Sequence, residues 1–303
     1  MKYLSVREIA KLWDKSERTV RNYCALGQIK GAFLTGKTWN IPEGAAIPVK
    51  GKKILPTDNI LLDTLRQEKS SKIKGGIYHK TQIEMTYNSN HIEGSKLTED
   101  QTRNIYETNT IGVINETINI DDIIEAANHF KCIDFIIDNA GEPLTEKLIK
   151  EIHFMLKIGT SDSQKDWFNV GDYKKLPNEV GGMQTTAPKD VPIEIKKLLH
   201  TYNSIENKKI VDIIEFHKNF ELIHPFQDGN GRIGRLIMFK ECLNNNIVPF
   251  IITEKLKLFY YRGLKEWNND SGYLIDTILT AQDAYKVYLD YFKIKYNISN
   301  NIK

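Results

Sequence analysis

The sequence contains little cysteine, no long apolar run and almost no net charge. Its 303 residues include three cysteines, Cys24, Cys132 and Cys242, which are too few and too far apart for a disulfide framework or a cysteine-based zinc site. We find no charged start followed by an apolar segment and no run of about 18 apolar residues, so we expect neither a secretion signal nor a membrane-spanning helix. These absences predict a cytoplasmic protein with reduced thiols and no membrane partner.

The composition instead supports a folded protein with a small basic segment at its start. Apolar residues make up 41% of the chain and aromatic residues 10%, which favours a buried core over disorder. Residues 1–50 hold nine Lys/Arg and four Asp/Glu, a balance of 9 − 4 = +5, and the net charge of +3 leaves −2 for the remainder. A basic head favours contact with a polyanion, although chance fluctuation also gives such a balance.

The first 50 residues predict two short helices followed by a hairpin. Ser5 with Glu8 has the pattern of a capping box, and Ser16 begins a second helix. The stretch "GAFLTGKTWNIP" then alternates in the manner of a short hairpin.

This order resembles that of excisionase-like winged helix-turn-helix domains. The resemblance implies DNA binding through the exposed face of the second helix, which carries Arg18, Thr19, Arg21 and Asn22. A small protein-binding or structural module remains the alternative, because helix-turn-helix sequences are degenerate.

Downstream, the pattern predicts a linker and then a mainly helical domain. Residues 51–78 read as a linker with a short helix, and apolar residues recur at helical spacing across residues 79–295. Residues 171–192 depart from this pattern, with three prolines and a Gly-Gly flanked by Val180 and Met183. This segment predicts a small β-hairpin, or flap.

The stretch "FELIHPFQDGNGRIGR", residues 220–235, concentrates polar and flexible residues within an apolar helical run. Pro225 ends the preceding helix and leaves His224 at the junction with a loop. A histidine placed there can take a proton from a hydroxyl, because it titrates near neutral pH. Asp228 is a hard oxygen ligand suited to one coordination position on Mg²⁺.

The second half of this stretch has the features of an anion site. Gly229, Asn230 and Gly231 lead into a new helix, whose first N–H groups and positive end form an anion nest. Arg232 and Arg235 lie three residues apart on that helix and can clamp phosphate oxygens. Together, the base, the metal carboxylate, the nest and the arginines predict transfer from a metal-bound polyphosphate to a hydroxyl.

The stretch "HPFQDGNGRIGR" resembles the signature of the Fic family, HPFx[D/E]GN[G/K]RxxR, at every fixed position. The resemblance implies transfer of AMP from ATP to a Ser, Thr or Tyr hydroxyl, with His224 as the base and Asp228 as the Mg²⁺ ligand. It also implies phosphate binding by the Gly229–Gly231 backbone, the Asn230 side chain and the arginines Arg232 and Arg235. Gly231 stands where the kinase branch of the family has lysine, which favours nucleotidyl transfer.

A second segment, "SNHIEG", resembles the family's inhibitory motif, [S/T]xxxE[G/N]. It comprises Ser89, Glu93 and Gly94 within a predicted inhibitory helix near residues 85–94. The resemblance implies that Glu93 pairs with Arg235, removes the cation that would bind the γ-phosphate and repels that phosphate. The alternative is that Glu93 is a solvated helix residue.

Three further sets of residues receive weaker predictions. "GDYK", at residues 171–174, resembles the family's GxYR with lysine replacing arginine, so the role of that position is open. Tyr260, Tyr261 and Asn268 lie where a downstream helix of the family covers adenine, and Tyr261 is our candidate ATP contact. His217 has no third metal ligand nearby, and we interpret it as a packing or hydrogen-bonding residue.

Taken together, these patterns predict a mainly α protein: a Fic-type helical bundle with a flap, preceded by a winged helix-turn-helix. The predicted function is ATP- and Mg²⁺-dependent adenylylation of a target protein, the enzyme itself included, with autoinhibition by Glu93. Three alternatives stay open: removal of AMP through a water that Glu93 positions, DNA-binding regulation with a nucleotide-sensing domain, and transfer of another group such as UMP or phosphate. Gly231 argues only against transfer of phosphate. The target, the DNA site and a homo-oligomeric state are not defined by the sequence.

Overall fold

The computed structural model describes residues 2–25, 29–36, 38–47, 58–112 and 117–296. The chain divides into two compact units, Met1–Pro56 and Thr57–Lys303. Each unit has its own hydrophobic core and is described here by itself.

The first unit packs two short helices on a small antiparallel sheet. The helices are α1 (Val6–Leu12) and α2 (Glu17–Ala25), and the strands are β1 (Tyr3–Leu4), β2 (Phe33–Thr35) and β3 (Thr38–Pro42), in the order β1-β3-β2. The predicted capping box is confirmed: the Glu8 carboxylate accepts from the Ser5 N–H at 2.8 Å, and the Ser5 hydroxyl accepts from the Glu8 N–H at 3.3 Å. Its core combines residues from both helices and from β3, namely Val6, Ile9, Trp13, Val20, Tyr23 and Ile41.

The face of α2 that carries the predicted DNA contacts points away from this core. Arg18, Arg21 and Asn22 are exposed, and Thr19 is half-buried. Arg21 pairs with Glu17 at 2.8 Å across one turn, an exposed ion pair that contributes little to stability. Contact of this face with DNA stays a prediction.

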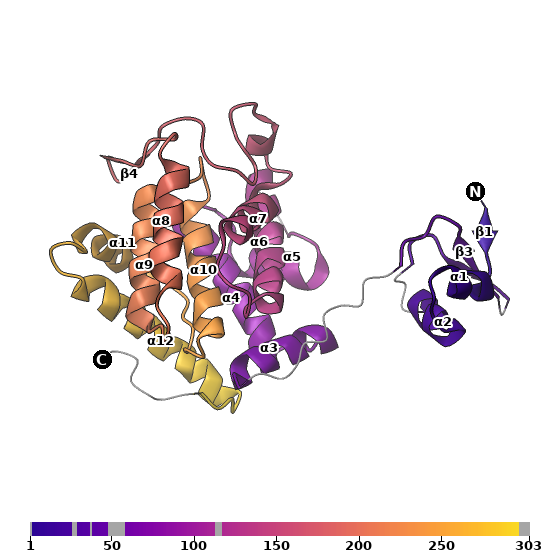
Figure 1. The fold of residues 1–303 in the computed structure, drawn as a ribbon. Helices are drawn as coiled ribbons and strands as arrows, with labels where there is room; N and C mark the ends of the chain where they lie inside the picture. The colour runs from indigo at the N-terminus through magenta and orange to yellow at the C-terminus, as the bar shows by residue number, and fades with distance from the viewer. Residues whose placement is uncertain (1, 26–28, 37, 48–57, 113–116, 297–303) are drawn as a thin grey trace. The chain divides into compact units, whose positions relative to one another are not determined.

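The second unit is almost entirely helical, as predicted (Figure 1). Its helices are α3 (Ile60–Ser71), α4 (Ile77–Ile92), α5 (Glu99–Thr108), α6 (Ile120–Asp138), α7 (Glu146–Lys157), α8 (Val191–Asn203), α9 (Ile210–Ile223), α10 (Asn230–Asn244), α11 (Lys257–Glu266) and α12 (Gly272–Tyr291), with 3₁₀ turns at Ser161–Gln164 and Glu254–Leu256. The predicted hairpin is also present, as β4 (Glu179–Val180) and β5 (Met183–Gln184) joined by two glycines with positive φ. The helix expected in the linker is α3, and its residues Leu61, Leu62 and Leu65 pack into the core of this unit.

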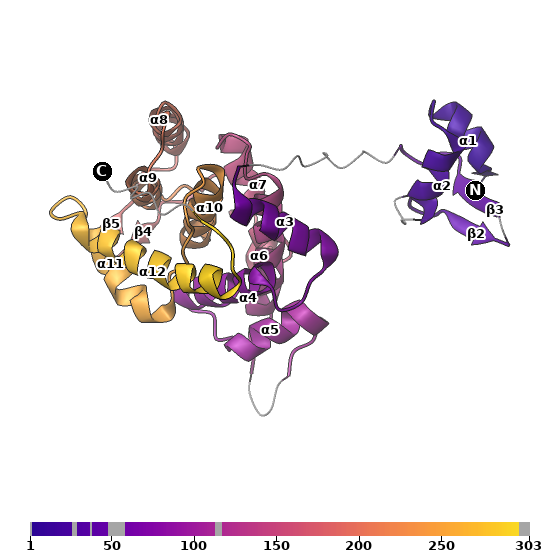
Figure 2. The same ribbon diagram turned by 90° about the horizontal axis from the view of Figure 1, so that it is seen from below.

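Helix α10 lies at the centre of the second unit. It is buried on nearly every side: the apolar residues Ile233, Leu236, Ile237, Met238 and Phe239 are buried, and so are charged residues such as Lys240 and Glu241. It contacts α9, α6, α4 and α7, and it lies beside α9 in both ribbon views (Figures 1 and 2). This packing holds the polar start of α10 against the ends of its neighbours.

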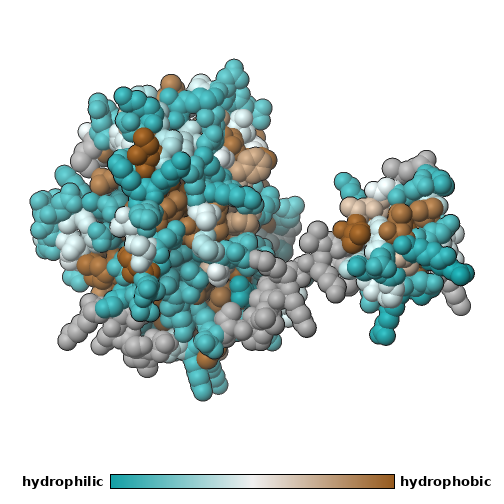
Figure 3. Space-filling model, in the orientation of Figure 1, coloured by the Kyte–Doolittle hydropathy of each residue, from teal (hydrophilic) through white to brown (hydrophobic). Residues whose placement is uncertain are grey.

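The surface of the second unit is mixed in character. On the face seen in Figure 3, hydrophilic residues predominate and apolar residues occur in scattered groups. Within the described ranges, none of the helices combines the length and apolar character needed to cross a bilayer. Cys24, Cys132 and Cys242 are buried, and their thiols are free.

Candidate active site

A pocket of about 580 Å³ opens where α9 ends and α10 begins. The end of α4, helix α11 and the β4–β5 hairpin complete its walls. His224, Arg235, Glu93 and Tyr261, all singled out in the sequence, line this one pocket, together with Glu221, which was not.

His224 caps α9 in a left-handed conformation, with φ of 50°. Its Nδ1 lies 3.3 Å from the carbonyl oxygen of Glu221, and because a carbonyl only accepts, this contact places the proton on Nδ1 and leaves Nε2 free to accept. Burial lowers the pKa of His224 to about 4, and the Glu221 carbonyl partly opposes the effect. The imidazole is therefore neutral at physiological pH, which is the form that a general base requires.

Asp228 is an ionised carboxylate held by two cations. Its Oδ2 lies 2.6 Å from Lys157 Nζ and 3.1 Å from Arg232 Nη2. Although burial raises its pKa, these cations and the Gly229 N–H hold the pKa of Asp228 well below its usual range. The side chain is 47% exposed, so it remains accessible to a ligand.

The loop before α10 has the geometry of an anion nest. Gly229 caps the helix with φ of 83°, a left-handed conformation that glycine adopts without steric cost. The Asn230 side chain is used within the loop: its Oδ1 accepts from the Phe226 N–H and its Nδ2 donates to the Phe226 carbonyl, both at 2.9 Å. This leaves the backbone of Asn230, rather than the side chain we expected, for a phosphate.

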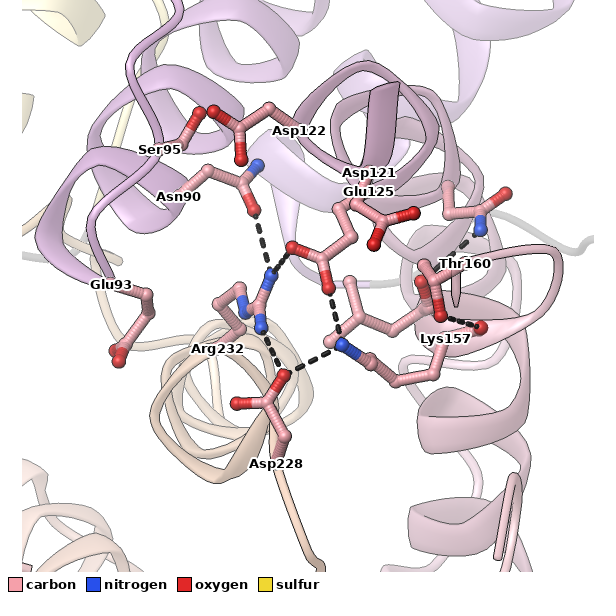
Figure 4. A network of polar contacts seen from close by, with 12 residues as sticks. Asn90, Glu93, Ser95, Asp121, Asp122, Glu125, Lys157, Thr160, Asp228 and Arg232 are labelled. Atoms are coloured by element: carbon pink, nitrogen blue, oxygen red, sulfur yellow. Dashed lines mark hydrogen bonds and ion pairs between the residues drawn. The ribbon is translucent and has the colours of Figure 1, made fainter. Parts of the chain in front are cut away.

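Arg232 belongs to a buried network of charges between α10, α6 and α7 (Figure 4). Its guanidinium pairs with Glu125 and Asp228, and Nη1 lies 3.4 Å from the Asn90 amide oxygen. Lys157 joins the same two carboxylates, at 2.5 Å from Glu125 and 2.6 Å from Asp228. The network thus links Asp228 and Arg232, which the sequence singled out, to Glu125 and Lys157, which it did not.

Arg235 makes the pairing expected from the sequence. Its Nη2 lies 2.6 Å from Glu93 Oε1 and 2.9 Å from the Ser89 carbonyl, and its Nε donates to Ser89 Oγ at 3.0 Å. Glu93 caps α4, and Gly94 follows with φ of 104°. Burial lowers the pKa of Arg235, but the nearby Glu93 carboxylate raises the pKa, and the net shift is upward. The arginine therefore stays charged. Arg235 Nη1 is buried and makes no hydrogen bond to Glu93 or Ser89.

Close packing at Gly231 makes this pairing possible. A Cβ atom built at Gly231 would lie 2.3 Å from Glu93 Oε1 and 3.0 Å from Arg235 Nη1. Any side chain at this position must displace the glutamate, because real Cβ contacts do not come so close.

The aromatic residues divide between core and pocket. Tyr260 is 1% exposed, and its hydroxyl lies 2.6 Å from His217 Nε2, so the packing and hydrogen-bonding role predicted for His217 is confirmed. Tyr261 is half-exposed, lines the pocket and bonds the Ile92 carbonyl at 3.4 Å. Asn268 is exposed and accepts from Lys218 at 3.0 Å. Of the three candidates for an adenine contact, Tyr261 and Tyr260 line the pocket.

Lys174, the departure from the GxYR pattern, anchors the hairpin. It is 3% exposed, and its Nζ donates to Asn178 Oδ1 and Thr185 Oγ1, both at 2.6 Å, on either side of β4 and β5. It also reaches the Ile223 carbonyl at 3.4 Å, next to His224. Burial lowers the pKa of Lys174 to about 8.

Three ionisable residues of this region escaped the sequence analysis: Lys157, which is buried, and Glu125 and Glu221, which are partly buried. The position of Lys157 was an available signal, because this lysine follows Leu156 at the end of a mostly apolar helix face. A lysine on such a face is buried only when an acidic residue pairs with it. Glu221 precedes His224 by one helical turn, and burial raises the pKa of its carboxyl to about 8.

Comparisons with known proteins find relatives of the segment that holds this site. The model of the Fic/DOC family matches residues 143–242. A relative named "Protein adenylyltransferase Fic" from Drosophila mojavensis is 27% identical over 183 residues, which is 59% of this chain and 35% of that protein. A "Probable protein adenylyltransferase" from Aquifex aeolicus is 32% identical over 105 residues, which is 33% of this chain and 32% of that protein. The chain therefore spans about a third of the length of these relatives.

Solved structures show the same fold. A Fic domain-containing signaling protein from Bacteroides thetaiotaomicron matches with a TM-score of 0.57 at 24% identity, covering 76% of this chain and 90% of that one. Fic-1 from C. elegans matches with a TM-score of 0.60 at 21% identity, covering 77% of this chain and 71% of that one. The predicted Fic-type helical bundle is thus confirmed.

Proposed function

We propose that the chain is a protein adenylyltransferase, from the premise that residues 143–242 match the Fic/DOC family. The proposed reaction transfers AMP from ATP to a Ser, Thr or Tyr hydroxyl of a target protein, which can be a second copy of the enzyme. The observation that carries the proposal is the convergence of His224 and Arg235 on one pocket, with Asp228 in the loop that joins their two helices.

His224 supplies the base in this reaction. Its unprotonated Nε2 accepts the proton of the target hydroxyl as the hydroxyl oxygen forms a bond to the α-phosphorus. The bond between that phosphorus and the bridging oxygen breaks, and pyrophosphate leaves with the bonding electrons. The burial that lowers the pKa of His224 to about 4 supports this role, because it keeps the base neutral.

The start of α10 supplies the phosphate contacts. Backbone N–H groups at the helix start, with Arg232 and Arg235, suit the charge of a triphosphate. In the part of the chain that the structure describes, no three His, Cys, Asp or Glu side chains are grouped around a metal position. A single ionised and half-exposed carboxylate nevertheless fits Mg²⁺, which keeps waters and phosphate oxygens as its other ligands. When bound, the ion would neutralise phosphate charge, and Asp228 is the residue that would hold it.

Glu93 acts as the brake in the proposed enzyme. Its carboxylate holds the Arg235 guanidinium at 2.6 Å and faces the pocket, so it removes a phosphate-binding cation and repels the phosphate itself. Its side chain is 31% exposed, which leaves it a path into solvent when the brake is released.

The test is intact mass spectrometry after incubation with ATP and Mg²⁺, with a cell lysate probed in parallel for nucleotidylated proteins. We expect one AMP adduct, on the protein or on lysate proteins, with Glu93→Gly and none with Glu93→Gly/His224→Ala. Wild type should react far more weakly than Glu93→Gly. Glu99→Gly is the matched control, because Glu99 begins the next helix and makes only an exposed pair with Arg103.

The contrary results identify the alternatives. If wild type and Glu93→Gly are equally active, the proposed inhibition by Glu93 is wrong. If no variant adds AMP but wild type removes it from adenylylated target, Glu93 serves the reverse reaction. Incubation with UTP in place of ATP distinguishes transfer of UMP.

A further inference from the structure

A buried lysine occupies one side of the carboxylate that we assign to the metal. Lys157, the last residue of α7, has a side chain that is only 2% exposed. Its Nζ lies 2.6 Å from Asp228 Oδ2, 2.5 Å from Glu125 Oε1 and 3.2 Å from Asp162 Oδ2. Figure 4 shows Lys157 and Arg232 directed at the Asp228 carboxylate from different sides.

The charges of this network balance without any metal. The three carboxylates are those of Glu125, Asp162 and Asp228, and Lys157 contacts all three. Two further cations complete the balance: Arg232 pairs with Glu125 and Asp228, and Lys165 pairs with Asp162 at 2.6 Å. A divalent ion would therefore add two positive charges to a neutral cluster. Polyphosphate oxygens are the groups that would offset this excess.

We propose that Lys157 is a built-in counter-cation that weakens the binding of free divalent metal at Asp228, so that metal enters with the nucleotide. This rests on the assignment of Asp228 as the metal carboxylate in the proposed function. Lys157 stands against Asp228 on the protein side, and it is too deeply buried and too fully paired to swing away. A divalent ion about 5 Å from a unit positive charge loses about tenfold in affinity even at the dielectric constant of water.

The test is titration with Mn²⁺ alone, without nucleotide, read by electron paramagnetic resonance of the free ion. We expect Lys157→Met to bind Mn²⁺ about tenfold more tightly than wild type, and Lys157→Met/Asp228→Asn to lose that gain. Lys165→Met is the matched control: it removes a charge from the same network, but its side chain is 44% exposed and reaches only the outer acid Asp162. Its affinity should stay within about twofold of wild type, since exposed charges are screened.

The inference is overturned if Lys157→Met binds Mn²⁺ no more tightly than wild type does. This outcome includes the case in which both proteins bind Mn²⁺ weakly or not at all. Thermal unfolding followed by circular dichroism checks that each variant is folded. If Lys157→Met is not, Lys157→Gln decides the question, because it removes the charge but keeps a hydrogen-bond donor. Because the titration involves no transfer of AMP, a tighter Lys157→Met site supports the inference even when the adenylylation assay fails.

Discussion

Substitution of Gly231 by alanine tests the proposed inhibition by Glu93 without replacing either residue of the Glu93–Arg235 ion pair. The new methyl group would lie 2.3 Å from Glu93 Oε1. Gly231 lies inside α10 and is not among the glycines with positive φ, so alanine fits the backbone and keeps the N–H of the nest. The atom that the methyl group would meet is at the end of the flexible Glu93 side chain. We therefore expect the Glu93 carboxylate to move away from Arg235, while the backbone stays in place.

The size of the effect follows from the contact that is lost. A hydrogen bond to a charged group contributes about 1.5–3 kcal/mol to stability. Loss of that stabilisation shifts the equilibrium between paired and free Arg235 by roughly 10- to 150-fold, since about 1.4 kcal/mol corresponds to a factor of ten. We therefore expect Gly231→Ala to raise the adenylylation rate by about one to two orders of magnitude, limited by the rate of Glu93→Gly.

The assay is the initial rate of AMP incorporation for wild type, Gly231→Ala, Glu93→Gly and the double variant. If the methyl group acts through Glu93, the double variant matches Glu93→Gly, because nothing remains to be displaced. Gly141→Ala is the control, since a Cβ there meets no atom within 4 Å. A Gly231→Ala protein no faster than wild type, or one that gains equally without Glu93, would refute the reasoning.

Two predictions concern titration. Since burial lowers the pKa of His224 to about 4, the kcat/KM of Glu93→Gly should stay level from pH 8 to pH 6 and fall only as pH approaches 4; a midpoint near 6.5 would contradict this. Burial also raises the pKa of Glu221 to about 8, with Glu93 adding to the shift and Arg235 opposing it. Unfolding therefore releases a proton between about pH 4.5 and 8, and stability falls as pH rises, by at most about 1.4 kcal/mol per pH unit. In urea unfolding, the free energy of unfolding of Glu221→Gln should therefore rise relative to that of wild type between pH 5 and pH 8. If the difference between the two free energies does not change with pH, the raised pKa of Glu221 is wrong.

The sequence predicted the parts of this site that are local. The residues from His224 to Arg235 are close along the chain, and the junction of Pro225 with the glycine loop sets their conformation through backbone sterics alone. Capping boxes such as Ser5 with Glu8 are equally local, and the structure contains them. The pairing of Glu93 with Arg235 spans 142 residues and was found only because the motif carried the information.

The parts that depend on packing were not predicted. Glu125, Lys157 and Asp228 meet because α6, α7 and α10 pack together, and no spacing in the sequence marks that meeting. The Asn230 side chain was assigned to phosphate, yet it closes its own loop onto Phe226, a choice set by the shape of the turn. Buried polar groups are satisfied by whichever partners the tertiary fold supplies.

The two arginines of the site differ in how firmly they are held. Arg232 pairs with Glu125, whose side chain is 12% exposed and is also held by Lys157. Arg235 pairs with Glu93, which is 31% exposed and has an open side toward the pocket. Separation of Arg232 from Glu125 would break an ion pair between side chains that are only 4% and 12% exposed, whereas Glu93 can rotate into water and recover its solvation. The fold therefore makes Arg232 a fixed cation and Arg235 a releasable one, which is the asymmetry that a built-in brake requires.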